Sequence, residues 1–154
     1  MVRLSDMTAD DAAHLLSKQC PRFPGKPFVA GPPLQDRRVA IITTAGLHRS
    51  NDTAFDLTDT GYRVIPGNVQ TADLAMSHTS VNFDRSGFQA DVNVVFPIDR
   101  LREMAAAGEI GSMANFHYSV IGAGWEPHEI EPTALEMAPL LHRDKVDAVL
   151  LVPV

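Results

Sequence analysis

The sequence predicts an α/β protein, a Rossmann-like three-layer sandwich with a mainly parallel sheet. Short apolar runs, which are typical of strands buried on both faces, recur along the chain. They alternate with segments of helical periodicity, as expected when helices connect parallel strands. The length of 154 residues suits one domain with one hydrophobic core.

Residues 1–35 are predicted to form an N-terminal arm and a proline-rich connector. Thr8 and Asp11 have the spacing of a helix cap and introduce a short helical pattern. The segment 20–33 is rich in proline and glycine, which favours an extended connector. The α/β domain is therefore expected to span residues 36–154.

Five segments of this domain have the apolar or alternating pattern of strands: 39–42, 63–65, 91–96, 116–121 and 146–154. The first is a continuous apolar run, which favours a strand inside a parallel sheet. The last is the most strand-like of the five.

Two helices are expected between these strands. Pro97 suits a first helical turn, an apolar face follows it, and Gly108 supplies a left-handed stop. A second helix is expected to open at Pro132 and to kink or end near Pro139. The side chains that this helix is expected to bury are Leu135, Ala138 and Leu141.

Composition excludes several functional classes. The formal net charge of −6 argues against a nucleic-acid surface, which needs clustered Lys and Arg. No apolar run reaches the length of a membrane helix. Cys20 has no second cysteine to pair with, so a reducing cytoplasm is expected. The six histidines lack metal-ligand spacing, and no metal site is predicted.

The final strand is expected to end at the functional edge of the sheet. Sites in open α/β sheets lie at the carboxyl ends of the strands, and here the chain stops at Val154 with no helix after it. We therefore expect the domain to lack its C-terminal part and to expose apolar surface. That surface predicts a homo-oligomer, most simply a dimer with two-fold symmetry. The alternative is an edge strand that simply closes the domain.

Six segments of the domain also occur, in this order, in a known family. They are Thr44–His48, Ile65–Gly67, Ser77–His78, Asp91–Glu103, Gly108–Gly111 and Val146–Leu151. Together they resemble the selenoprotein B subunits of the glycine, sarcosine, betaine and D-proline reductases, and the D-proline type most closely.

This resemblance implies an oxidoreductase. In the family, the strand similar to 146–154 is followed at once by selenocysteine, or by cysteine in some relatives. The selenolate or thiolate cleaves a C–N bond reductively, a partner subunit supplies a pyruvoyl group, and a dithiol is the electron donor. Because the nucleophile is expected directly after Val154, a chain that ends there is predicted to be truncated at the selenocysteine position and inactive. No cofactor is expected within the chain itself.

Two histidines are the candidate catalytic residues. His48 follows the first strand and His78 lies in a polar loop, where either ring could transfer a proton. Asp84 and Arg85 follow His78 and could bind a carboxylated substrate, with the guanidinium of Arg85 donating two N–H bonds to the carboxylate. A solvated surface loop is the alternative for these positions.

Asp91 and Asn93 are the remaining candidates for substrate binding. They alternate on one face of the predicted strand 91–96, where a buried hydrogen-bond network is as plausible as a site. Two other functions stay open for the whole chain. One is a small-molecule-binding or protein-interaction module without catalysis, and the other is a hydrolase or lyase that uses His48 or His78.

Overall fold

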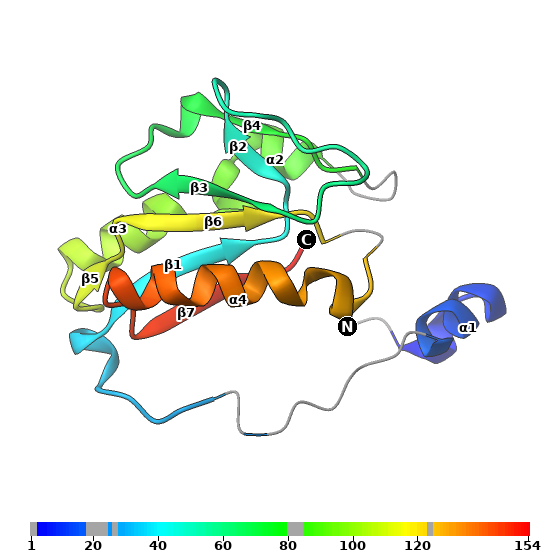
Figure 1. Cartoon of the computed structure of the whole chain (residues 1–154), viewed down its shortest axis with the longest axis horizontal. Coiled ribbons are helices and arrows are strands. Elements are labelled where there is room, and N and C mark those ends of the chain that lie inside the picture. The colour runs from blue at the N-terminus through cyan, green and yellow to red at the C-terminus, as the bar shows by residue number, and fades with distance from the viewer. Residues whose placement is uncertain (1–2, 18–24, 26–27, 80–84, 123–124) are drawn as a thin grey trace.

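A mixed sheet with helices around it forms the centre of the computed structural model (Figure 1). The α/β class is confirmed, and parallel strands are present, but a Rossmann-like three-layer sandwich is not confirmed. The structure describes residues 3–17, 25, 28–79, 85–122 and 125–154.

Strand β1 (Arg38–Thr43) is the hub of the sheet, as its apolar run predicts. It pairs in parallel with β5 (Ser112–Met113), β6 (Phe116–Val120) and β7 (Ala148–Val152). Strand β3 (Tyr62–Pro66) lies antiparallel to β6, which makes the sheet mixed. The predicted strands 39–42, 63–65 and 116–121 are therefore confirmed.

A two-stranded antiparallel ribbon follows β1 along the chain. It consists of β2 (Leu47–Arg49) and β4 (Leu74–Met76), with His48 opposite Ala75. Because β2 begins close behind the carboxyl end of β1, the ribbon brings two distant segments of sequence to that end of the sheet.

Four α-helices occur among the described residues: α1 (Ala9–Ser17), α2 (Ser86–Ala90), α3 (Ile98–Ala106) and α4 (Pro127–Arg143). In Figure 1, α4 crosses in front of the sheet and α3 lies behind it. Helix α3 confirms the prediction made from its apolar face, and Gly108 has the expected positive φ of 73°. No described helix has the length and apolar character needed to cross a bilayer.

The core lies between β1 and α3. Alternate β1 side chains, Val39 and Ile41, pack there with Ile98 and Leu101 of the helix and with Ile65 of β3. All five side chains are buried. This core fixes the sheet whose carboxyl edge carries the candidate site.

The predicted strand 91–96 is wrong, because the segment forms a 3₁₀ turn (Val92–Val94) after α2. The Asp91 carboxylate accepts the backbone N–H of Asn93 at 2.9 Å, and the Asp91 carbonyl accepts that of Val94. Such local bonds satisfy the backbone without a partner strand.

The second helix begins earlier than predicted, at Pro127, because a capping box starts it there. The Glu129 carboxylate accepts the Glu126 N–H at 2.8 Å, and Pro127 suits the first helical position. Pro132 and Pro139 both lie inside the helix on its exposed side. Since water can reach the carbonyls that the two prolines leave unbonded, the helix continues through both.

The buried face of α4 also differs from the prediction. Thr133 and Met137 are buried, whereas Leu135 is 67% exposed and Ala138 is exposed. Positions 133 and 137 are one turn apart and therefore lie on the same face of the helix, where the Thr133 hydroxyl donates to the Thr60 carbonyl at 2.6 Å.

Strand β7 lies beside β1 and pairs with no other described strand, which makes it an edge of the described sheet. That the domain lacks its C-terminal part stays a prediction. The apolar side chains of β7 are exposed to solvent: Val149 is 38% exposed, Leu150 is 41% exposed and Leu151 is 68% exposed. Apolar surface is thus exposed, as predicted. Self-association through this surface stays a prediction, and so does the boundary between residues 35 and 36.

Candidate functional site at the carboxyl edge of the sheet

The carboxyl ends of β1 and β7 are joined around Thr44. The Thr44 N–H donates to the Val152 carbonyl at 3.1 Å, and the Val154 N–H donates to the Thr44 hydroxyl at 2.8 Å. The Gly122 N–H, just after β6, reaches the Thr44 carbonyl at 3.4 Å. Three parallel strands therefore present their carboxyl ends to one loop, the arrangement in which α/β sheets carry sites.

A tight turn at Gly46 connects this loop to β2. Gly46 has a φ of +65°, and a Cβ at this position would lie 3.2 Å from the backbone nitrogen of His78. Its N–H donates to the Val120 carbonyl at 3.0 Å, and its carbonyl accepts the Ser77 N–H at 2.9 Å. The glycine is required here because it lets residues 77 and 78 approach the turn closely.

His48 and Ser77 form a hydrogen-bonded pair just beyond this turn. The His48 ring is only 6% exposed, and its Nε2 lies 2.8 Å from Ser77 Oγ. Its Nδ1 lies 2.8 Å from the Arg49 carbonyl. A carbonyl oxygen can only accept, so the proton belongs on Nδ1, and Nε2 is left to accept the Ser77 hydroxyl proton. This arrangement suits a general base acting through a hydroxyl.

His78 lies next to this pair and is also buried, at 4% exposure. Burial lowers the pKa of His78, and the positive charge of Arg85 lowers it further. Arg85 donates from Nη2 to the His78 carbonyl at 2.6 Å. The structure thus brings His48 to Ser77 and Arg85 to the backbone of the neighbouring His78, while Asp84 lies outside the described residues.

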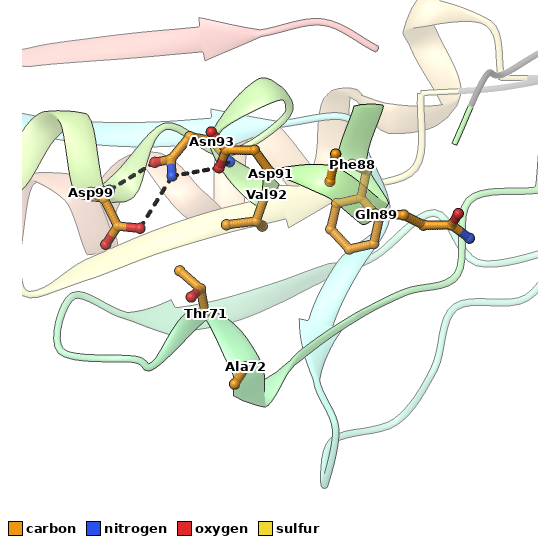
Figure 2. Close-up of a pocket in the computed structure, with 9 residues that line it drawn as sticks. Thr71, Ala72, Phe88, Gln89, Asp91, Val92, Asn93 and Asp99 are labelled. Carbon is orange, nitrogen blue, oxygen red and sulfur yellow. Dashed lines mark hydrogen bonds between the residues drawn. The ribbon is translucent and has the colours of Figure 1, made fainter. Parts of the chain in front are cut away.

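Asp91 and Asn93 line a separate cavity of about 370 Å³, together with Thr71 and Phe88 (Figure 2). The Asn93 side chain donates to Asp91 Oδ1 at 2.8 Å and to Asp99 Oδ2 at 3.1 Å. Its own oxygen accepts the Asp99 N–H at 3.0 Å, at the start of α3.

The Asn93 bonds hold the cavity wall together. Hydrogen bonds from the backbone and side chain of Asn93 lower the pKa of Asp91. Both residues are therefore part of a structural network, and a role for them in substrate binding stays a prediction.

Ser77 is the member of this site that sequence reasoning did not single out. The sequence feature that could have identified Ser77 is its position next to His78 in the segment Ser77–His78 of the family resemblance. Nothing in the local sequence, however, predicts that residues 48 and 77 lie in contact. Within the described ranges, no group of three or more His, Cys, Asp or Glu side chains is placed to hold a metal ion.

Residues 33–154 match the model of a protein family described as glycine/sarcosine/betaine reductase selenoprotein B. The D-proline reductase subunit gamma of Acetoanaerobium sticklandii is 38% identical over 120 residues, which cover 77% of this chain and 49% of that protein. The betaine reductase complex component B subunit beta of Peptoclostridium acidaminophilum is 28% identical over 128 residues, 77% of this chain and 28% of that protein.

The glycine reductase complex component B subunit gamma of Symbiobacterium thermophilum is 27% identical over 129 residues, 78% of this chain and 30% of that protein. The matched part of the chain thus corresponds to half or less of the length of these relatives. No solved structure matches the chain.

Proposed function

This chain belongs to the glycine/sarcosine/betaine reductase selenoprotein B family, and on that premise we propose that it is the scaffold of a reductase component. Its reaction would be the reductive cleavage of a C–N bond in an amino acid or amine. The observation that carries the proposal is the family match over residues 33–154, because the matched segment includes both the carboxyl ends of β1, β6 and β7 and His48.

We place the reactive residue, a selenocysteine or cysteine, directly after Val154. When present, its selenolate or thiolate supplies the nucleophile for C–N cleavage. The hydrogen bond from the Val154 N–H to Thr44 supports this position, since it holds the end of β7 against the loop that leads to His48. A chain without that residue would be inactive as a reductase.

The His48–Ser77 pair is suited to move the proton that the reaction needs. A selenol or thiol reacts as its anion, so a base must first remove its proton. His48 Nε2 can take that proton through the Ser77 hydroxyl, to which it is already hydrogen-bonded at 2.8 Å. Returning the proton to the departing nitrogen would restore His48 to its starting state. Arg85, beside His78, is assigned to a substrate carboxylate.

Partner subunits are part of this proposal. The relatives are named as subunits or complex components. We accordingly propose a partner with a pyruvoyl group and a dithiol electron donor, in the cytoplasm.

The test is an assay of the chain extended after Val154. Versions ending in cysteine, selenocysteine or serine are mixed with the pyruvoyl-bearing partner, dithiothreitol, and D-proline, glycine, sarcosine or betaine. Mass spectrometry of the products should show conversion with cysteine or selenocysteine and none with serine. His48→Gln should lower kcat by about 100-fold or more, the usual contribution of acid–base catalysis. Equal conversion by the serine version would refute the proposed nucleophile position.

A further inference from the structure

We propose that a second cavity, beside Arg49, binds a small monocarboxylate. It has a volume of about 370 Å³. Its polar lining consists of Arg49, Ser50, Asn51, Asn68, Gln70 and Asp73. The inference goes beyond the proposed function, because this cavity is separate from the loop at Thr44.

Arg49 is a half-buried cation that lacks an anion. Its Nε is buried and has no hydrogen-bond partner, and no ion pair involves this side chain among the residues the structure describes. By contrast, four other arginines are ion-paired with carboxylates: Arg38, Arg63, Arg100 and Arg102. A guanidinium that is partly removed from water and unpaired is well prepared to bind an oxyanion through two parallel N–H bonds.

The part of the lining that comes from residues 66–70 is held in place before any ligand binds. Arg102 donates from Nη2 to the carbonyls of Gly67 and Val69 at 2.9 and 2.6 Å. The Gly67 N–H donates to the Asn115 carbonyl at 2.7 Å. The backbone of residues 66–70 is thus fixed from outside the cavity, and this reduces the ordering cost of binding.

The lining favours an anion of single charge. The amides of Asn51, Asn68 and Gln70 are neutral and can donate to carboxylate oxygens. Asp73 contributes a negative charge to the same lining. Repulsion by this carboxylate would penalise a phosphate dianion more than a monocarboxylate.

The cavity and the candidate catalytic pair use opposite sides of the same strand. His48 and Arg49 are consecutive in β2, so their side chains point to opposite faces. The His48 ring meets Ser77, whereas Arg49 lines the cavity. Loss of carboxylate binding at Arg49 can therefore be distinguished from loss of the proposed reductase chemistry.

The test is an NMR titration of the chain with sodium acetate, with sodium phosphate at pH 7.5 and sodium chloride at matched ionic strength as comparisons. We expect the Arg49 Nε–H resonance to shift saturably with acetate and the affinity for phosphate to be at least tenfold lower. Arg49→Gln should lower the acetate affinity at least tenfold. Asp73→Asn should reduce the difference between the affinity for acetate and the affinity for phosphate. Arg100→Gln, at an exposed arginine outside the cavity, should bind acetate like the unchanged chain.

The proposal is overturned if chloride produces the same shift, if phosphate binds as tightly as acetate, or if Arg49→Gln binds normally. Thermal unfolding checks that each variant is folded. If Arg49→Gln does not fold, the acetate and phosphate affinities of Arg49→Lys and Asp73→Asn test the proposal instead. Arg49→Lys should bind acetate more weakly but still detectably, because lysine keeps the positive charge and lacks the paired N–H donors of a guanidinium. If Asp73→Asn prefers acetate over phosphate as strongly as the unchanged chain does, the proposed selectivity is contradicted.

Discussion

The Nε2 atom of His48 lies 2.8 Å from the hydroxyl oxygen of Ser77, across the antiparallel ribbon of β2 and β4. The Arg49 carbonyl, 2.8 Å from Nδ1 of the same ring, fixes which nitrogen carries the proton. This relationship places an imidazole that is oriented by the backbone and hydrogen-bonded to a hydroxyl in the ribbon that follows the carboxyl end of β1.

Replacing Ser77 with alanine should change the hydrogen bonding of His48 without changing its tautomer. Long-range ¹H–¹⁵N spectra should show Nδ1 protonated and Nε2 unprotonated in both proteins, with the Nε2 resonance shifted in Ser77→Ala. Loss of one hydrogen bond should reduce the free energy of unfolding by about 1 kcal/mol. Ser5→Ala, on the exposed arm, is the control and should leave the His48 resonances unmoved. A proton on Nε2 in the unchanged chain would contradict the assignment.

The stability of the protein should fall between pH 6.5 and pH 4 because of His117. This ring is fully buried, its Nδ1 accepts the Ile41 N–H at 2.9 Å, and its Nε2 has no hydrogen-bond partner among the described residues. Burial, with a smaller effect from Arg102, lowers the pKa of His117 from 6.5 to about 4. The unfolded chain therefore binds the proton first as the pH falls, and the free energy of unfolding should drop by about 3 kcal/mol across this window.

Urea unfolding at pH 7.5 and pH 4.5 measures this loss. His78 contributes in the same direction, because its pKa is also lowered. The comparison with His117→Gln isolates His117, since glutamine can still accept the Ile41 N–H but does not titrate. The variant should be less stable at pH 7.5 and should lose less stability on acidification. An equal loss in both proteins would show that another group is responsible.

Removing the Asp144 carboxylate should destabilise the fold by about 2–4 kcal/mol. It is paired with Arg38 at 2.7 Å and accepts the backbone N–H groups of Asn115 and Phe116 at 2.6 and 3.1 Å. Burial raises the pKa of Asp144, but the hydrogen bonds from Arg38 and these N–H groups together hold it below its ordinary value. It thereby fixes the end of α4 to β1 and β6.

Chemical denaturation of Asp144→Ala tests this role. Glu136→Ala, at an exposed position of α4, is the matched control and should change the free energy of unfolding by less than about 0.5 kcal/mol. If the two variants lose similar amounts of stability, Asp144 does not hold these elements together.

The exposed side of β7 should promote self-association. Val149 and Leu151 share one face of a strand that pairs only with β1 among the described strands. Contiguous apolar exposure of this kind commonly marks an interface. Sedimentation velocity over a range of concentrations should show a dimer or larger oligomer. Leu151→Lys should shift the population to monomer, whereas Leu57→Lys, at an exposed leucine in a loop, should not. A monomer at high concentration in the unchanged chain would refute the prediction.

Local patterns in the sequence were enough to predict much of the sheet. The apolar run of β1, the short strands β3 and β6, and α3 with its stop at Gly108 all lie close to their predicted positions. Each depends on periodicity or on turn chemistry within a few residues. Local pattern also misled at 91–96, where the Asp91 side chain forms a turn with Asn93 in place of strand pairing.

The parts that sequence could not supply involve residues far apart along the chain. His48 could be placed after the first strand, but its bond to Ser77 depends on the pairing of β2 with β4. The Asp144 carboxylate accepts hydrogen bonds from residues 38, 115 and 116, and no sequence pattern links these positions to residue 144. The buried face of α4 depends on contacts such as the bond from Thr133 to the Thr60 carbonyl, which joins residues far apart along the chain.

The most direct test of the account is the reactivity of a single cysteine added after Val154 in a Cys20→Ser background. Its rate of alkylation by iodoacetamide is measured as a function of pH. A site beside the His48–Ser77 pair predicts a thiol pKa at least one unit below the ordinary value of about 8.5, returning toward that value in His48→Gln. An added thiol that titrates near 8.5 and is indifferent to His48→Gln would contradict the claim that this edge of the sheet is built for a reactive selenolate or thiolate.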